Sequence, residues 1–217
     1  MLHQEQGVMY MSKNGSLRFI FVRHGETTGN SSIRFFGKAD IPLSDEGQEQ
    51  MRAAGEVLKT EHFDVIFTST LCRTIEGARI IAGNRNIPLY PMIEFREIDF
   101  GIWEGLTLEE IEEKDPVLFA EWRKDFWKFD YPEGDIRNEF IEKVKSGIDN
   151  VLNKINKGTV LLVLHKGIIR TAIYYLLGNL DNHHKSFQAD LGSIHELERI
   201  NGKWNYKKIN YTEHLPK

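Results

Sequence analysis

The chain has 217 residues, 41% of them hydrophobic, which is enough apolar material for one substantial core and too little for several domains. Its net charge of -4 argues against the broad basic surface of nucleic-acid-binding proteins. No apolar run approaches the roughly 20 residues that cross a bilayer. The single cysteine allows no internal disulfide. We therefore expect a cytoplasmic protein with neither a nucleic-acid partner nor a membrane.

The chain divides into a leader and one domain. Residues 1–16 show no periodicity, and we expect a flexible leader before a single domain over 17–217. Three short segments are apolar on both faces, which is typical of central strands covered by helices on both sides. These segments are 17–22, 64–69 and 159–164.

Helical spacing of apolar residues predicts helices between and after these strands. One follows Ser44, an N-cap candidate before an acidic first turn. The longest covers 135–157. Another begins near Lys166 and ends at Gly178, which suits a left-handed C-terminal cap.

The order of these elements predicts the fold class. Strands that alternate with helices favour a three-layer α/β/α sandwich with a mainly parallel central sheet. Asn201-Gly202 joins the extended segments 193–200 and 204–209 in a predicted hairpin, which would add an antiparallel edge. The segment 106–132 interrupts the alternation. We expect a helical cap insertion over a site there, and a plain amphipathic insertion that packs on the core is the alternative.

Basic residues follow the predicted strands, at the edge where open α/β sheets bind ligands. They are Arg23 and His24 after the first strand, Arg73 after the second and His165 after the third. Such a group repels itself unless an anion lies within it, and the planar fork of arginine fits a phosphate. Two histidines in a phosphate pocket favour covalent catalysis, in which an imidazole attacks phosphorus and a carboxyl group protonates the leaving alkoxide.

The carboxyl group belongs to a short acidic stretch, in which Glu97, Asp99 and Glu104 are equal candidates on chemistry alone.

The position of Arg73 is independent support for a bound anion. It would occupy the first turn of a helix, where the helix dipole disfavours a cation. Exposure of Arg73 to solvent, or pairing with Glu76, is the alternative.

Several histidines, the cysteine and four aromatic residues are expected to have structural roles or to shape the site rather than to take part in the chemistry. His183, His184 and His195 lack a carboxylate at metal-ligand spacing, so we expect exposed histidines and no metal site. Cys72 is expected to be a small buried residue beside the site. Four aromatic residues are expected to wall the substrate cleft: Trp122, Phe126, Trp127 and Phe129.

Four blocks of sequence carry a family resemblance. They are the segments 67–74, 96–107 and 163–170, preceded by Phe21-Val22-Arg23-His24-Gly25-Glu26-Thr27. In this order they closely resemble the histidine phosphatase superfamily, the phosphoglycerate mutase-like proteins. The resemblance implies the α/β sandwich of that family and covers about residues 17–178.

The resemblance also implies a role for each matched residue. His24 matches the phosphorylated nucleophile, His165 the second histidine, and Glu97 the general acid and base. Phosphate-binding positions are matched by Arg23, Arg73, Asn30 and Gly25. Lys166 stands where many members carry glycine. Its backbone N–H can still bind phosphate, and the role of its side chain stays open.

These matches imply a metal-independent phosphomonoesterase that hydrolyses a small phosphorylated metabolite through a phosphohistidine on His24, with no cofactor. The short chain and the continuation Glu26-Thr27 favour hydrolysis over a phosphoglycerate mutase, which would need 2,3-bisphosphoglycerate. The segment 100–107 also resembles α-ribazole phosphatase of cobalamin synthesis. A non-catalytic phospho-ligand binder is a further alternative, and a homodimer is left open together with the physiological substrate.

Overall fold

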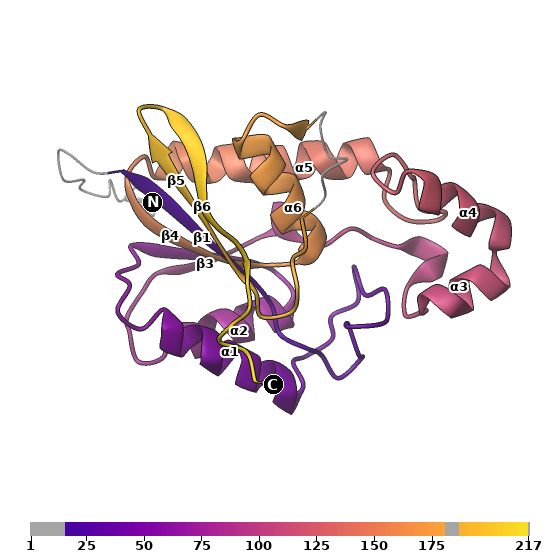
Figure 1. Cartoon of the computed structure of the whole chain (residues 1–217), viewed down its shortest axis with the longest axis horizontal. Helices are drawn as coiled ribbons and strands as arrows, with labels where there is room; N and C mark the ends of the chain where they lie inside the picture. The colour runs from indigo at the N-terminus through magenta and orange to yellow at the C-terminus, as the bar shows by residue number, and fades with distance from the viewer. Residues whose placement is uncertain (1–15, 181–186, 217) are drawn as a thin grey trace, which may run out of the picture.

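The computed structural model describes residues 16–180 and 187–216, which form the predicted α/β/α sandwich (Figure 1). Apart from Ser16, the expected leader lies outside the described residues, as do His183 and His184. One sheet of six strands occupies the middle layer, in the order β3-β2-β4-β1-β5-β6. The strands are β1 (Leu17–Arg23), β2 (Val65–Ser69), β3 (Leu89–Met92), β4 (Gly158–Leu164), β5 (Ile194–Ile200) and β6 (Lys203–Tyr211).

The sheet is mainly parallel, as expected. β1 pairs in parallel with β4, β4 with β2, and β2 with β3. β5 and β6 form the predicted hairpin, and β5 runs antiparallel to β1. β3 was not predicted, because it has only four residues and contains Pro91. Proline is tolerated at a sheet edge, where β3 lies, but it obscures a strand pattern.

Helices cover both faces of the sheet, with α1 and α2 on one side and α5 and α6 on the other (Figure 1). The helices are α1 (Asp45–Val57), α2 (Cys72–Ala82), α3 (Leu108–Lys114), α4 (Pro116–Lys124), α5 (Arg137–Lys154) and α6 (Lys166–Leu176), with 3₁₀ turns at η1 (Ile93–Phe95) and η2 (Gly101–Trp103). None of the helices within the described ranges is long and apolar enough to span a membrane.

β1 illustrates why the strands are apolar on both faces. Its side chains alternate, so that Phe19 and Phe21 belong to the core under α5 and α6, whereas Ile20 and Val22 belong to the core on α1 and α2. This double burial fixes the carboxyl end of β1 between two packed layers.

Local signals set the helix ends. Ser44 caps α1 as predicted, because its Oγ accepts a hydrogen bond from the Gly47 N–H at 3.1 Å. Gly178, which follows α6, has the expected left-handed φ of 68°. The segment 106–132 contains α3 and α4, which extend to one side of the sandwich (Figure 1).

His195 on β5 is buried, so the expectation that it is exposed was wrong. Its Nδ1 accepts the Asn210 N–H at 3.1 Å, which leaves Nε2–H to donate to Ser193 Oγ at 3.1 Å. Burial lowers the pKa of His195 to about 4. A proton on Nδ1 would remove the acceptor and place an unpaired charge in the core.

His195 therefore makes stability sensitive to acid. Between its ordinary pKa of 6.5 and about 4, the unfolded chain binds a proton there that the folded chain does not, so stability falls as the pH drops. We expect urea unfolding at pH 7 and pH 5 to show that His195→Gln reduces the pH-dependent loss of free energy by about 2 kcal/mol. An equal loss in wild type and variant would contradict this assignment.

Candidate active site

The pairing of β1 with β4 brings His24 and His165 together. Arg23 lies opposite Leu164 in the register of the two strands, and each histidine follows directly. The His24 N–H donates to the Leu164 carbonyl at 3.0 Å. The two imidazole centroids lie 5.1 Å apart, with the ring planes 68° from parallel. The predicted meeting of two histidines at one sheet edge is confirmed.

His24 is a buried, neutral imidazole, and one of its ring nitrogens has no hydrogen-bond partner among residues 16–180 and 187–216. Its Nδ1 lies 2.7 Å from the Gly25 carbonyl, so Nδ1 carries the proton and Nε2 keeps its lone pair. Burial lowers the pKa of His24 well below 6.5, and the charges of Arg73 and Arg23 lower it further. Nε2 is therefore available as a nucleophile near neutral pH.

Two arginines, Arg73 buried and Arg23 half-buried, flank the histidines and are oriented by backbone carbonyls. Arg73, fully buried in the first turn of α2, donates to the Ala39 carbonyl at 2.7 Å and to the Gly37 carbonyl at 2.9 Å. Arg23 donates to the Ala189 carbonyl at 2.9 Å. Burial lowers the pKa of Arg23 to about 10, so it stays charged at neutral pH. The exposed alternative for Arg73 was wrong.

Glu97 is a buried carboxylate held against the first turn of α6. Its Oε2 accepts the Gly167 N–H at 2.8 Å, and Oε1 accepts the N–H of Ile98 at 3.0 Å. A side chain at Gly167 would collide with Oε1. The amino end of α6 thus places a carboxylate at the site, as its positive dipole end favours.

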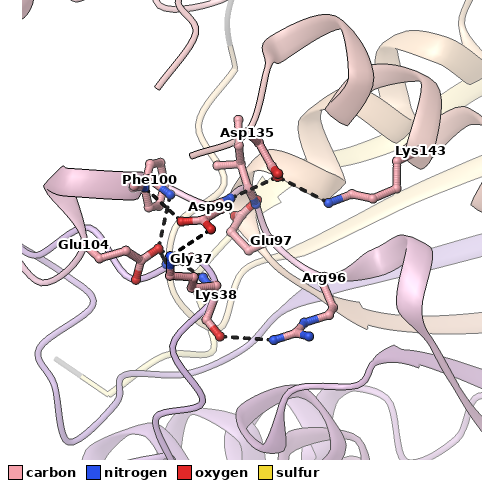
Figure 2. A network of polar contacts seen from close by, with 11 residues as sticks. Gly37, Lys38, Arg96, Glu97, Asp99, Phe100, Glu104, Asp135 and Lys143 are labelled. Carbon is pink, nitrogen blue, oxygen red and sulfur yellow. Dashed lines mark hydrogen bonds and ion pairs between the residues drawn. The ribbon is translucent and has the colours of Figure 1, made fainter. Parts of the chain in front are cut away.

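The other two acidic candidates support a neighbouring loop (Figure 2). Asp99 pairs with the Lys38 ammonium at 3.0 Å, and one oxygen of Glu104 accepts the N–H groups of Gly37 and Lys38 at 2.9 and 3.0 Å. The same loop supplies the Gly37 carbonyl that binds Arg73. Glu104 and Asp99 therefore act on the site through the position of Arg73.

Several nitrogen atoms around His24 are buried and form no hydrogen bond in the described part of the chain. They are Nε of Arg23, Nε of Arg73 and both ring nitrogens of His165. Buried polar groups in native proteins are normally satisfied. The pKa of His165 lies well below 6.5 because of burial and the nearby charge of Arg73. This arrangement of unsatisfied nitrogen atoms and positive charge suits an oxyanion.

An open cleft of about 560 Å³ reaches this group. Arg23, His24 and Glu97 line it, whereas Arg73 and His165 are fully buried next to these residues and do not belong to the lining. The predicted aromatic wall is confirmed for three residues: Trp122, Phe126 and Trp127. Phe129 does not line the cleft and instead stacks on Trp103, with ring centroids 5.1 Å apart. The volume is in the range of small-molecule sites.

Three other predicted site residues have distinct placements. Asn30 is exposed in a turn with φ 62° and does not line the cleft, so the structure does not bring it to the other phosphate-binding candidates. A side chain at Gly25 would collide with the backbone of Gly47, so α1 packing requires this glycine. Lys166 lines the cleft and is partly exposed. Desolvation of its ammonium in the cleft, and next the charge of Arg23, lower its pKa to about 8.

Cys72 is half-buried rather than buried. Its N–H donates to an Asp40 carboxylate oxygen at 2.7 Å. Burial and the Asp40 carboxylate raise the pKa of the thiol to about 11, so Cys72 is unreactive at neutral pH.

Three arginines that line the cleft were not predicted: Arg34, Arg137 and Arg170. Arg34 is paired with the Glu110 carboxylate at 2.8 Å. Arg170 lies one helical turn after Lys166, so its position on the cleft-facing side of α6 could have been inferred from helical spacing. Arg137 begins α5 and carried no comparable signal, because its placement depends on how the 106–132 segment packs.

Comparisons with known proteins agree with this geometry. A model of the histidine phosphatase superfamily (branch 1) matches residues 19–212. Phosphoserine phosphatase 1 of Hydrogenobacter thermophilus is 33% identical over 92% of this chain and 94% of its own. The adenosylcobalamin/alpha-ribazole phosphatase of Escherichia coli is 28% identical over 87% and 92% of the two chains.

Solved structures give the same result. YhfR of Bacillus stearothermophilus superposes with a TM-score of 0.81 at 27% identity, covering 92% of this chain and 100% of its own. The alpha-ribazole phosphatase of Shigella flexneri has a TM-score of 0.81 at 26% identity, covering 89% and 96%. The chain therefore belongs to the histidine phosphatase superfamily, and its phosphatase relatives support a phosphatase.

Two glycine substitutions should separate positioning of the site from folding. Gly167→Ala meets the end of the Glu97 side chain, which can move, so we expect phosphatase activity to fall on the order of a hundredfold with little change in melting temperature. Gly25→Ala meets the Gly47 backbone and should cost about 1–3 kcal/mol of stability. Full activity in a folded Gly167→Ala variant would contradict the positioning of Glu97 by α6.

Proposed function

We propose that the protein is a phosphomonoesterase that hydrolyses a small phosphorylated metabolite through a phosphohistidine on His24, without a metal ion. One observation carries this proposal. A neutral imidazole with a free Nε2 is surrounded by buried arginine and histidine nitrogens that have no hydrogen-bond partners among the described residues. A phosphoryl group satisfies those nitrogens and places phosphorus next to Nε2.

In the first step, Nε2 of His24 attacks phosphorus, and the phosphorus–nitrogen bond forms as the ester phosphorus–oxygen bond breaks. Arg23 and Arg73 stabilise the charge on the phosphoryl oxygens. The departing alkoxide takes a proton from the Glu97 carboxyl group. His165 contributes a hydrogen bond to the transferring group.

In the second step, water attacks the phosphohistidine and Glu97 accepts a proton from it. The phosphorus–nitrogen bond breaks, inorganic phosphate leaves, and His24 regains its lone pair. Glu97 returns to the protonated state that the next cycle requires. Because Gly167 and Ile98 hold the carboxylate by their N–H groups, one side chain can serve both steps from one place.

The relatives support hydrolysis. Two of them are named as phosphatases of phosphoserine and of adenosylcobalamin/alpha-ribazole. A mutase must keep the phosphoryl group, so dependence on 2,3-bisphosphoglycerate would favour that alternative. The assay therefore measures phosphate release from p-nitrophenyl phosphate and metabolite esters with excess chelator, with vanadate as inhibitor. Release that needs an added metal ion would overturn the metal-independent mechanism.

His24→Ala should abolish turnover, because His24 is the histidine among the described residues that lines the cleft, with its Nε2 free to attack. Phosphorus NMR of the wild-type enzyme quenched and denatured in alkali, where phosphohistidine is stable, should detect phosphate on Nε2, since Nδ1 is bound to a carbonyl. His62→Ala, which changes an exposed histidine, is the matched control and should retain wild-type activity. Normal turnover by His24→Ala would remove His24 from the nucleophile role.

Glu97→Gln should separate the two steps. p-Nitrophenolate leaves without needing a proton, so the first step should survive with p-nitrophenyl phosphate, whereas attack by water loses its base. We expect a burst of p-nitrophenolate followed by slow release of phosphate, with the phosphohistidine accumulating. A single slow phase without the intermediate would argue against Glu97 as the base.

A further inference from the structure

The cleft contains a second group of cations that the proposed chemistry does not use. Lys166 and Arg170 lie one turn apart on α6, so they project from the same face of that helix. Arg137 is the first residue of α5. All three line the same cleft as His24.

Aromatic rings hold the two arginines of this group. The Arg170 guanidinium carbon lies 5.2 Å from the Phe126 ring centroid and 5.0 Å from that of Trp127. Arg137 lies 5.9 Å from the same Trp127 ring and 5.5 Å from the Tyr131 ring. A ring over the face of a guanidinium leaves its N–H groups pointing along the edge, where a carboxylate or phosphate binds.

The positive charge of the two arginines is not balanced by an ion pair within the described residues. Arg137 donates to the Phe126 carbonyl at 2.9 Å, which is a neutral partner. Nε of Arg137, and both Nε and Nη2 of Arg170, are buried without a hydrogen-bond partner. Both side chains are more than nine-tenths buried. Two like charges that share the Trp127 ring cost free energy unless an anion joins them.

Lys166 connects this group to the reacting centre. The charges of both Arg23 and Arg170 act on its ammonium. One substrate molecule can therefore place its phosphoryl group at His24 and another group near Arg170.

We propose that Arg170, Arg137 and Lys166 form a subsite for a second anionic group, so that the preferred substrate is a phosphomonoester that also carries a carboxylate or another phosphate. This inference rests on the proposed function, since it assumes that the reacting phosphoryl group lies at His24. A carboxylate and a phosphate would both bind as an oxyanion at the edge of the Arg170 guanidinium. The choice of substrates in the test distinguishes one from the other.

The test compares esters that differ in one anionic group. O-Phosphoserine is compared with O-phosphoethanolamine, which lacks the carboxylate, and fructose 1,6-bisphosphate with fructose 6-phosphate. We expect wild-type kcat/KM to favour the more anionic member of at least one pair by tenfold or more. The pair that shows the preference identifies the anion. A ratio near one for both pairs would overturn the subsite.

Arg170→Gln should lower that ratio about tenfold, and Arg170→Lys should lower it less, because the charge remains while the planar fork is lost. The ratio does not depend on the fraction of folded enzyme, so a destabilised variant still gives an answer. Arg123→Gln is the matched control. Arg123 is exposed, lies over the Phe119 ring at 5.8 Å and does not line the cleft, so this variant should keep the wild-type ratio.

The outcomes distinguish the two proposals. Hydrolysis of p-nitrophenyl phosphate with no preference for anionic esters, or with an unchanged ratio in Arg170→Gln, would overturn the subsite and leave the phosphomonoesterase intact. Absence of hydrolysis of every ester by folded wild-type protein would overturn both.

Discussion

The parallel pairing of β1 with β4 is the constraint on which the site depends. It sets His24 and His165 side by side at the carboxyl ends of two central strands. The backbone N–H of His24 donates to the Leu164 carbonyl and so continues the pairing beyond the strand end. Both strands are buried on both faces, so this edge cannot shift without disturbing two packed cores. The distance between the imidazoles is therefore a property of the core rather than of the loops.

Backbone groups orient the charges that the pairing brings together. Carbonyl oxygens bind Arg23 and Arg73, and they fix each guanidinium without cancelling its charge. A carboxylate in the same place would reduce the potential available to a phosphate. Glu97 is held in the opposite way, by N–H groups at Ile98 and at Gly167 in the first turn of α6. The backbone thus orients each charged side chain without neutralising it, before any ligand binds.

The sequence was sufficient to predict what local patterns encode. Apolar strands, the Ser44 cap and the residues after each strand end were confirmed, because each depends on a few neighbouring positions. Features that depend on distant contacts were missed or wrong. His195 is buried with Phe187 packed near its ring and with Nδ1 bound to the Asn210 N–H, and Arg137 reaches the cleft through the packing of the 106–132 segment. Neither contact has a signature at short sequence separation.

Desolvation links the two cation groups in the cleft. Burial keeps His24 neutral, and the same low-dielectric surroundings strengthen the field of Arg23 and Arg73 at the position proposed for the reacting phosphoryl group. Arg170 is oriented by aromatic rings rather than by carbonyls, and those rings belong to the 106–132 segment rather than to the strand ends. If both proposals hold, changes to that segment alter which ester is preferred without moving the groups assigned to act on phosphorus.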